Sequence, residues 1–209
     1  MNGVRIVVFA KAPVAGVAKT RLIPALGAEG AAVLARRMLA HALDAARRAA
    51  IGTVELCMSP SGDDRAWTAI ELPAGVHRSS QGEGDLGARM ARVVRRVTNE
   101  GGAVILMGTD CPGLSAARLR WVAYGLSRFD AVLVPTYDGG YAALGLRRYD
   151  PAVFAGIEWS TSSVAGETLA RIARLNWGTL VGERVHDIDV PADLRFLPQR
   201  RAPQRRRRG

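Results

Sequence analysis

Three basic residues near the N-terminus are the first candidates for chemistry. Lys11, Lys19 and Arg21 lie in the segment 9–22, where small residues allow a backbone to approach a ligand closely. Of the 29 basic residues in the chain, only Lys11 and Lys19 are lysines. A lysine ammonium is a compact point charge that binds phosphate oxygens, and arginine serves wherever else the chain needs a cation. We therefore interpret this segment as a phosphate-binding loop.

The segment differs from a P-loop. Lys19-Thr20 resembles the end of a Walker A motif, but that motif would need glycines at the positions of Pro13 and Ala18. In our interpretation Ala12 and Gly16 join the three cations in binding a nucleotide. An ordinary basic surface loop is the alternative.

Asp110 is the strongest single candidate. It follows the apolar run 103–107, within Gly-Thr-Asp-Cys-Pro at 108–112. A carboxylate at the end of a buried strand can hold Mg²⁺ (or Mn²⁺) that bridges phosphate oxygens. One alternative is that Asp110 caps the next helix, although Ser115 is better placed to do so. A nucleophilic Cys111 is the other, but no histidine lies close to it in the pattern.

The second metal ligand should come from a separate loop. The segment 186–191, His-Asp-Ile-Asp-Val-Pro, carries Asp187 and Asp189, with Asp193 just beyond. Mg²⁺ is commonly bound by one or two carboxylates, so we choose Asp189 as the partner of Asp110. The spacing is equally compatible with a helix-capping role for Asp189.

Two glycine-containing segments are candidate substrate loops. The first, 82–90, is flexible enough to reach around a base or a sugar, and Gly82 and Gly87 are its predicted nucleotide contacts. The second puts a carboxylate and an aromatic ring on a turn, and its predicted substrate contacts are Asp138, Gly139, Gly140 and Tyr141. Plain turn chemistry is the alternative for both segments.

A layered α/β domain is needed to position these segments. Apolar runs rich in β-branched residues alternate with longer segments of helical period, which favours a mostly parallel sheet. The expected strands are 4–9, 53–58, 76–78, 103–107, 131–134, 142–146 and 179–181. The expected helices are 29–50, 63–70, 86–97, 115–126, 163–175 and a short one from Pro191. We predict a single three-layer, Rossmann-like domain over residues 1–198, with ligands beyond the carboxyl ends of its strands.

Composition limits the function classes. A length of 209 residues fits one domain. No apolar run approaches the roughly 18 residues of a membrane span, and the N-terminus leads into a strand rather than a signal peptide, so we expect no membrane span and a cytoplasmic protein. Cys57 and Cys111 show no spacing typical of a disulfide framework or a zinc site.

The net charge of +10 is unevenly placed. Six arginines lie in the last ten residues, which leaves +4 for the rest of the chain. We expect residues 199–209 to be a disordered, Arg-rich tail that binds nucleic acid weakly at most. A non-catalytic RNA- or partner-binding protein is the alternative from another class, but the aromatic content of 6% offers no stacking surface that can be identified.

Five motifs in order resemble the DUF2064 family. They are Phe-Ala-Lys-Ala-Pro-x-Ala-Gly-x-Ala-Lys-Thr-Arg-Leu at 9–22, Gly-x-Gly-Asp-Leu-Gly-x-Arg-Met at 82–90, Gly-Thr-Asp-Cys-Pro at 108–112, Asp-Gly-Gly-Tyr at 138–141 and Trp-Ser-Thr at 159–161. The resemblance covers about residues 3–197. That family is similar to GT-A glycosyltransferases, is often named as glycosyltransferases associated with radical-SAM proteins, and is related to the nucleotidyltransferases of molybdenum-cofactor and coenzyme F420 biosynthesis.

The resemblance implies a nucleotide-diphospho-sugar transferase (GT-A) fold with Mg²⁺ or Mn²⁺ at its site. Lys11, Lys19 and Arg21 match its phosphate-binding loop, and Asp110 matches its metal-binding aspartate. Asp189 is similar to the second metal ligand of several nucleotidyltransferases of this fold.

One departure bears on the reaction. The segment 108–110 has a single acid where many glycosyltransferases of this fold carry Asp-x-Asp, so the metal site looks closer to the nucleotidyltransferase version. We therefore expect a metal-dependent transferase that moves a nucleotidyl group from a nucleotide donor to a small phosphorylated or hydroxylated acceptor. Lys19, Arg21 and Asp110 are its predicted catalytic residues. Glycosyl transfer from a nucleotide sugar on the same site is the alternative, since a fold does not fix a reaction.

Overall fold

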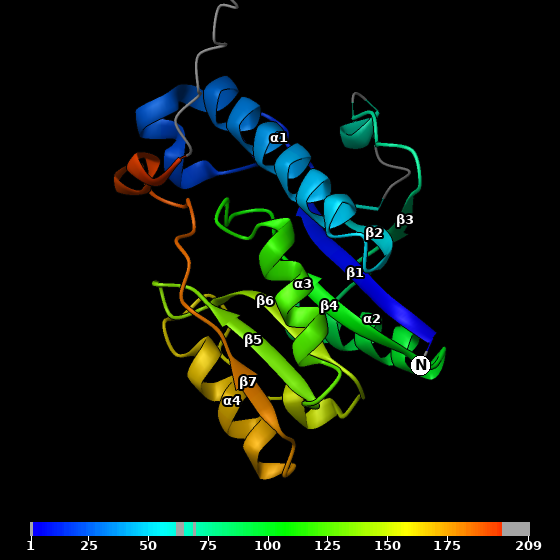
Figure 1. Ribbon diagram of the computed structural model, residues 1–209. Coiled ribbons are helices and arrows are strands. Elements are labelled where there is room, and N and C mark those ends of the chain that lie inside the picture. Colours follow the sequence, from blue (N-terminus) through cyan, green and yellow to red (C-terminus); the bar gives the residue numbers. More distant parts are fainter. Residues whose placement is uncertain (1, 62–64, 69, 198–209) are drawn as a thin grey trace, which may run out of the picture.

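Seven strands form one sheet in the computed structural model, which describes residues 2–61, 65–68 and 70–197 (Figure 1). The strands are β1 (Asn2–Lys11), β2 (Gly52–Ser59), β3 (Val76–Ser80), β4 (Gly102–Met107), β5 (Ala131–Pro135), β6 (Tyr141–Leu146) and β7 (Thr179–Val181). Their order across the sheet is β3-β2-β1-β4-β6-β5-β7. Strand β6 runs antiparallel to its neighbours β4 and β5, whereas the other pairs are parallel. The mostly parallel sheet predicted from the sequence is confirmed.

The helices connect these strands. They are α1 (Ile23–Ala49), α2 (Leu86–Asn99), α3 (Ala116–Gly125) and α4 (Val164–Arg174), with short 3₁₀ turns η1 (Thr20–Leu22), η2 (Arg65–Trp67), η3 (Pro151–Val153) and η4 (Pro191–Phe196). Ser115 caps α3, as predicted, by accepting a hydrogen bond from the backbone N–H of Arg118. The final short helix is present as η4.

The structure extends one helix prediction and corrects another. The first helix runs over Ile23–Ala49, but Gly27, with φ +70°, lies outside helical geometry and separates one turn before it from a long helix after it. The predicted range 29–50 corresponds to that long part, and glycine tolerates the backbone conformation at the kink. The helix predicted over 63–70 appears as the short turn η2, and residues 62–64 and 69 lie outside the described part of the chain.

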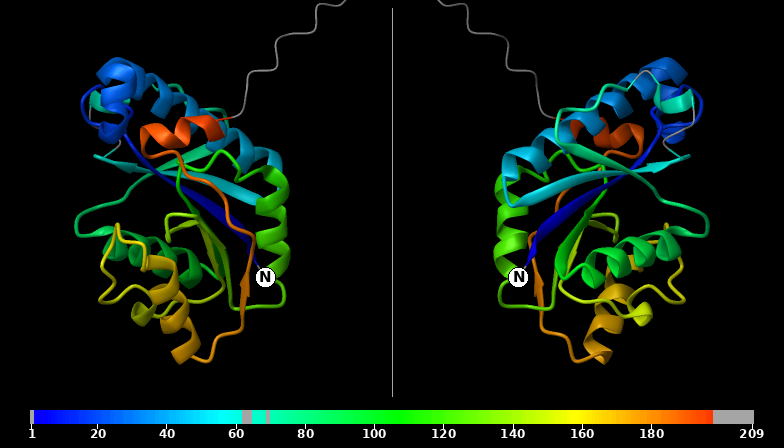
Figure 2. Two further views of the ribbon diagram at one scale, coloured as in Figure 1. Left: turned by 90° about the vertical axis from the view of Figure 1, so that its left-hand side faces the viewer. Right: turned by 90° about the vertical axis from the view of Figure 1, so that its right-hand side faces the viewer.

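The helices form two layers on opposite faces of the sheet (Figure 2). One apolar core joins α1 and α3 to one face, with Leu43 and Leu119 fully buried in it. The other joins α2 and α4 to the opposite face through residues such as Val94 and Ile172. The three-layer arrangement is confirmed. The predicted boundary at residue 198 and the predicted Arg-rich tail lie outside the described residues, and no helix among the described residues has the length and apolar character to cross a membrane.

The order of the strands reverses its direction beside β1. From β1 the chain proceeds outward to β2 and β3, and then returns to place β4 on the other side of β1. The carboxyl ends of β1 and β4 therefore lie next to each other, at the edge of the sheet where open α/β folds bind ligands. The segments that begin at Ala12 and at Gly108 meet at this point.

A small third core brings the C-terminal segment to the same place. Leu22 and Ile188 are fully buried there against Met38 of α1, and Leu194 and Phe196 pack around them. Figure 1 shows η4 in orange-red beside the blue N-terminal loop. Residues far apart in the sequence are thus fixed side by side at the carboxyl end of β1.

Candidate functional site

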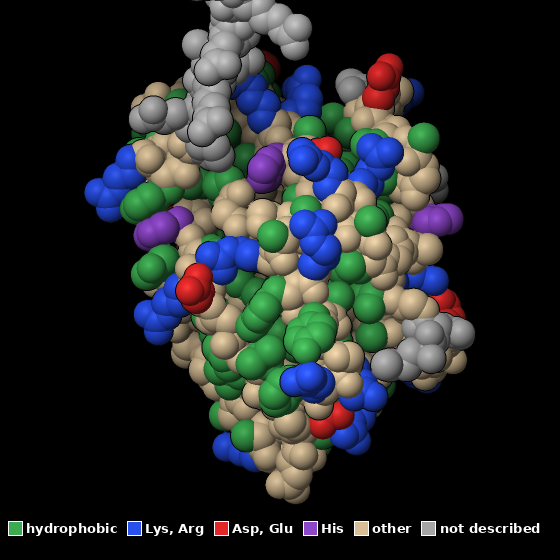
Figure 3. All heavy atoms as spheres, viewed as in Figure 1, with side chains coloured by type: hydrophobic (Ala, Val, Ile, Leu, Met, Phe, Trp, Pro, Cys, Tyr) green, Lys and Arg blue, Asp and Glu red, His purple; other side chains and the backbone are tan. Residues whose placement is uncertain are grey.

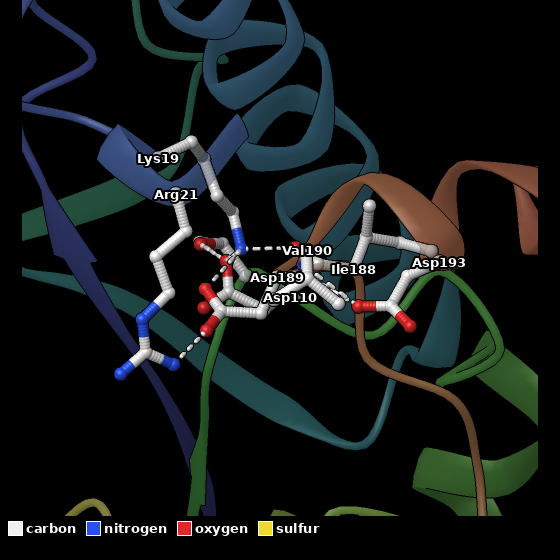
Figure 4. Close-up of polar contacts among 8 residues, drawn as sticks. Lys19, Arg21, Asp110, Ile188, Asp189, Val190 and Asp193 are labelled. Atoms are coloured by element: carbon white, nitrogen blue, oxygen red, sulfur yellow. Dashed lines mark hydrogen bonds and ion pairs between the residues drawn. The ribbon is translucent and has the colours of Figure 1, made fainter. Parts of the chain in front are cut away.

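The ammonium of Lys19 joins the three segments that meet beyond β1 and β4 (Figure 4). Its Nζ lies 2.7 Å from Asp110 Oδ1 and 3.8 Å from Asp189 Oδ1, and it donates a 2.5 Å hydrogen bond to the carbonyl of Ile188. The Lys19 side chain is only 7% exposed, whereas those of Asp110 and Asp189 are 50% and 39% exposed. The cation is therefore buried beneath two carboxylates that still reach solvent.

Arg21 supplies a second cation on the solvent side of this group. Its Nη1 donates to Asp189 Oδ2 at 2.7 Å, and its side chain is 67% exposed. A guanidinium carries five N–H donors, so the contact with Asp189 leaves several of them free. Arg21 is thus aimed by Asp189 and remains open to an anionic ligand.

Local backbone structure explains how the loop delivers these cations. The carbonyl of Val14 accepts hydrogen bonds from the N–H groups of Val17 and Ala18, which closes a turn around Gly16. Gly16 has φ +76°, a conformation that other residues adopt only with strain. Lys19 itself has φ +51°, and the turn η1 follows at once. The chain reverses sharply enough for its cations to reach back to the end of β4.

Asp110 is held by the loop that follows β4. The hydroxyl of Thr109 donates to Asp110 Oδ1 at 3.2 Å, and the N–H of Ile188 donates to the Asp110 carbonyl at 2.9 Å. The same loop is tied to α1, because His41 Nε2 lies 3.0 Å from the carbonyl of Pro112. Asp110 does not cap α3, since Ser115 has that role.

Asp193, and not Asp189, caps the start of η4. Its Oδ2 accepts hydrogen bonds from the N–H groups of Asp189, at 2.9 Å, and Val190, at 2.8 Å. The carboxylate of Asp189 instead contacts Lys19 and Arg21. Asp193 thus fixes the backbone at Asp189 while leaving the Asp189 side chain available to the site.

The Asp193 cap should make a pH-dependent contribution to stability. Partial burial opposes ionisation, but the N–H groups of Val190 and Asp189 outweigh it and lower the pKa of Asp193. A lowered pKa gives stability that is present above the ordinary carboxyl pKa and is lost as the pH falls through the folded-state value. We expect Asp193→Ala to lower the free energy of unfolding by about 1 kcal/mol at pH 7, measured by urea denaturation.

The size of that loss should depend on pH in one direction. It should stay constant from about pH 8 to about pH 5 and shrink as the pH falls below about 4, where the wild-type carboxylate is protonated as well. Asp193→Asn, which keeps an acceptor oxygen, is the matched control and should lose less. An equal loss at every pH would show that the Asp193 carboxylate acts through packing rather than through its charge.

The donor set at this point fits a divalent cation. Asp110 and Asp189 come from separate loops, and both place an oxygen within 3.8 Å of one cation, the Lys19 ammonium. Within the described ranges no group of three or more His, Cys, Asp or Glu side chains has the arrangement of a metal site. Two carboxylates are the usual protein contribution to a Mg²⁺ site that is completed by water and substrate phosphates.

Two further predicted residues, Lys11 and Ala12, lie at the start of the first loop. Lys11 is the last residue of β1, and its side chain is exposed. Ala12 is buried, and its N–H donates to the carbonyl of Ser59 at the end of β2. Both therefore sit at the same edge of the sheet as Lys19, at the start of the loop that Gly16 turns.

The predicted nucleotide contacts Gly82 and Gly87 have different surroundings. Gly82, with φ +70°, is the second residue of the loop after β3 at this edge of the sheet and lies against the guanidinium of Arg92. Gly87 is buried, and a Cβ added there would lie 2.8 Å from the ring of Trp159. Gly87 therefore has a packing role, since it lets the start of α2 lie against Trp159, and no described contact brings it to the Lys19 group.

Gln81 and Arg89, which the sequence did not single out, hold the loop after β3. Gln81 is buried and donates through Nε2 to the carbonyls of Ala10 and Cys57, at 3.2 and 3.0 Å. Arg89 donates to the carbonyl of Gly84 at 2.8 Å. Arg89 is part of the motif at 82–90, so its position beside the glycines was a usable signal, whereas nothing in the sequence distinguished Gln81.

The turn at 138–141 divides its residues between two roles. The Asp138 carboxylate accepts hydrogen bonds from the Thr136 hydroxyl and from the N–H of Gly140, so it shapes the turn itself. Gly139 has φ +93°, and a Cβ there would lie 2.0 Å from the carbonyl oxygen of Ser162. The Tyr141 hydroxyl lies 3.6 Å from Met90 Sδ, on the side of the sheet covered by α2. The structure thus directs Tyr141 into the core and away from the Lys19 group.

Two further ionisable groups lie in the acidic surroundings of this site. Burial, reinforced by Asp138, raises the pKa of Asp187. Burial, reinforced by Asp110 and then Asp187, raises the pKa of the Cys111 thiol far above its ordinary value. A thiol in that environment stays protonated at neutral pH and is a poor nucleophile. The structure therefore gives no support to nucleophilic catalysis by Cys111.

An aromatic stack links the C-terminal segment to the 138–141 turn. The ring of His186 lies between Tyr137 and Phe196, with ring centroids 4.1 and 3.6 Å apart and nearly parallel planes. Sequence reasoning missed this stack, because the three rings come from separate segments and share no periodic pattern. The stack fixes the segment that leads into Asp189.

Comparison with known proteins gives a family and a fold. The model of DUF2064, described as "Uncharacterized protein conserved in bacteria", matches residues 42–161. No curated protein matches the sequence.

Three solved structures illustrate the structural similarity. A protein from Desulfovibrio desulfuricans G20, provisionally named a nucleotide-diphospho-sugar transferase, has a TM-score of 0.88 and 29% identity, covering 100% of this chain and 92% of its own. Rv0371c of Mycobacterium tuberculosis, in complex with manganese, has a TM-score of 0.53 and 19% identity, covering 93% and 97%. CMP:2-keto-3-deoxy-manno-octonic acid synthetase, in complex with CTP, has a TM-score of 0.55 and 13% identity, covering 93% and 96%. The last two share the fold.

Proposed function

Because the chain belongs to the DUF2064 family, whose matched region includes Asp110, we propose that it is a metal-dependent nucleotidyltransferase that uses a nucleoside triphosphate as donor. The observation that carries this proposal is the meeting of two cations and two carboxylates beyond β1 and β4. Lys19 and Arg21 both contact Asp189, and Lys19 also contacts Asp110. Neighbours of the same fold that hold manganese or CTP support it.

Positive charge and oxygen ligands are the two requirements of a triphosphate site. Arg21 meets the first, because its exposed guanidinium has donors free to bind phosphate oxygens as a fork. Lys11 adds an exposed cation at the start of the same loop. Asp110 and Asp189 would hold a divalent cation, which supplies charge neutralisation on the phosphates when bound.

The reaction follows from those parts. An oxygen of the acceptor attacks the α-phosphorus of the donor in line, the bond to the β-phosphate breaks, and pyrophosphate leaves with the electron pair. The roles of the protein are to position the triphosphate and to stabilise the charge that develops on its oxygens, for which Lys19 and Arg21 are placed. No protein nucleophile is needed, in agreement with the protonated thiol expected at Cys111.

Glycosyl transfer is a second candidate, favoured by the name given to the Desulfovibrio desulfuricans relative. In that reaction the same cations would hold the diphosphate of a nucleotide sugar as the leaving group. The single acid in Gly-Thr-Asp at 108–110 favours the nucleotidyl reaction, because many glycosyltransferases of this fold carry two acids there.

Binding of RNA or of a protein partner would rest on basic surface rather than on this group. Figure 3 shows Lys and Arg side chains distributed over one face among apolar and neutral groups, rather than gathered into one patch. Removal of residues 200–209 tests this alternative: it should abolish a salt-sensitive RNA affinity if there is one and leave nucleotide turnover unchanged.

The deciding experiment is a ligand screen of the purified protein beside Asp110→Ala. Thermal shift is measured with the four NTPs and with nucleotide sugars, each with and without Mg²⁺ or Mn²⁺, and pyrophosphate release is followed with candidate acceptors. We expect an NTP to raise the melting temperature of wild type, but not of the variant, only when metal is present. Metal-dependent stabilisation by nucleotide sugars alone would favour glycosyl transfer. Equal shifts of wild type and Asp110→Ala with every ligand would contradict both reactions.

A further inference from the structure

The contacts of Lys19 are at odds with a simple phosphate-binding role. An ammonium has three N–H donors, and two oxygens lie at hydrogen-bond distance from this one, Asp110 Oδ1 at 2.7 Å and the Ile188 carbonyl at 2.5 Å, with Asp189 Oδ1 farther away at 3.8 Å. The side chain is also 7% exposed, so a phosphate would meet almost none of it. As it lies, Lys19 is engaged with the protein, and the open cations of the loop are Arg21 and Lys11.

The ammonium also occupies the position that a divalent ion requires. Carboxylate oxygens bind Mg²⁺ at about 2.0–2.1 Å. Asp110 Oδ1 already holds Lys19 Nζ at 2.7 Å, and the nearer Asp189 oxygen lies 3.8 Å from the same nitrogen. An ion shared by these two carboxylates would approach the ammonium as a like charge in a partly buried place, where screening by water is weak.

We propose that Lys19 is a displaceable internal cation of the metal site, which binds Asp110 and Asp189 in the resting protein and is transferred to the donor phosphates when metal and nucleotide bind together. The inference rests on the metal site of the proposed function, and it adds that the metal binds tightly only together with the nucleotide. Metal alone must displace the ammonium without offering it a new partner, so it binds weakly. The phosphates of a nucleotide supply that partner, which couples the two ligands positively and reciprocally.

The neighbouring contacts allow the transfer. Asp193 and the buried Ile188 hold the backbone of the C-terminal segment independently of Lys19. The Ile188 N–H also donates to the Asp110 carbonyl, so the two loops stay together without the ammonium. Departure of Lys19 from Asp110 would therefore leave both carboxylates in place for the ion.

Metal affinity measured without nucleotide tests the proposal directly. Mn²⁺ binding is followed by electron paramagnetic resonance for wild type, for Lys19→Met and for Lys11→Met. Methionine is an unbranched side chain one atom shorter than lysine and carries no charge. Lys11 is the matched control because it is the only other lysine of the chain and directly precedes the same loop. We expect Lys19→Met to bind Mn²⁺ alone on the order of tenfold more tightly than wild type, with Lys11→Met within about twofold of wild type.

Wild-type protein gives a second measurement that does not depend on a variant. Lysine labelled with ¹³C and ¹⁵N yields signals from two side chains only, and Lys11→Met assigns them. Mg²⁺ together with CTP should shift the Lys19 signals and speed the exchange of its ammonium protons, while Mg²⁺ alone at the same concentration changes them less. These changes are expected because the ammonium leaves a buried, hydrogen-bonded position.

The outcomes separate this inference from the proposed function. If Lys19→Met binds Mn²⁺ no more tightly than wild type, or if the wild-type Lys19 signals do not change with saturating Mg²⁺ and CTP, Lys19 is not displaced and the inference is overturned. The proposed function survives that result as long as wild type, but not Asp110→Ala, binds the metal with nucleotide. If wild type binds no divalent ion with or without nucleotide, both proposals fail.

Discussion

Asp110→Asn is expected to lower the rate of nucleotidyl transfer by about 10³-fold at saturating donor. Asparagine keeps an oxygen at the same position but removes the negative charge that would hold a divalent cation against the phosphates. The fold should survive, because Asn still offers an acceptor to Lys19 and the Ile188 carbonyl continues to accept from the ammonium. The measurement is pyrophosphate release under single-turnover conditions, compared with the melting temperature of each protein.

Cys111→Ala is the matched control for this substitution. Cys111 follows Asp110 directly and is half-buried, so its replacement perturbs the same loop. Its thiol has a raised pKa and takes no part in the proposed reaction. We expect Cys111→Ala to retain activity within about threefold, because Ala at a partly buried position costs mainly packing. A loss at Cys111→Ala as large as that at Asp110→Asn would show that the loop, and not the Asp110 carboxylate, is what the substitution damages.

The fold was predictable where the pattern is local. Every strand except the polar edge strand β3 contains a short apolar run, and the periodic faces of α2 and α4 identify the helices behind them. Asp110 could be selected for the same reason, since it is the first acid after the uncharged run 103–107. The single helical turn over 23–26 could not be predicted, because Gly27 is typical of a helix boundary and the long part of α1 does begin directly after it.

The partners within the site depend on contacts that no local pattern records. Arg21 and Asp189 are separated by 168 positions in the chain, and their 2.7 Å contact exists because Leu22 and Ile188 pack in one small core. The capping role of Asp193 is similarly hidden, since spacing allows either aspartate to cap η4. For Tyr141 the local pattern was misleading. A tyrosine after a glycine turn is typical of a binding loop, but the alternation of side chains along β6 turns this one toward α2.

These contacts also separate two kinds of cation that look alike in the sequence. Lys19 is buried and has acidic and carbonyl partners on the protein, whereas Arg21 is two-thirds exposed and shares only one carboxylate. Removal of Lys19 should therefore mainly raise the affinity for metal alone, and removal of Arg21 should mainly lower the affinity for the nucleotide. The same loop would serve both ligands with residues two positions apart.

Arg21→Ala is accordingly expected to reduce kcat/KM for the donor nucleotide by about 10²-fold, with the larger part in KM. The guanidinium is held by Asp189 at 2.7 Å and faces solvent with free donors, so its loss removes a positioned phosphate contact from both ground and transition states. Arg21→Lys should recover only part of the loss, because an ammonium cannot bind phosphate as a fork while keeping its contact with Asp189.

Arg148→Ala is the control for Arg21→Ala, because it removes the same charge at a place far from the candidate site. Arg148 is 57% exposed and pairs with Asp130 at 2.6 Å, which resembles the Arg21 pair. Asp130 directly precedes β5, so this pair lies at the amino end of a parallel strand, away from the carboxyl ends where the candidate site lies. Steady-state kinetics with varied donor should show Arg148→Ala close to wild type, since an exposed ion pair contributes about 1 kcal/mol at most to stability and nothing to this site. Equal losses from Arg21→Ala and Arg148→Ala would mean that net positive charge, rather than a guanidinium fixed beside Asp189, attracts the nucleotide.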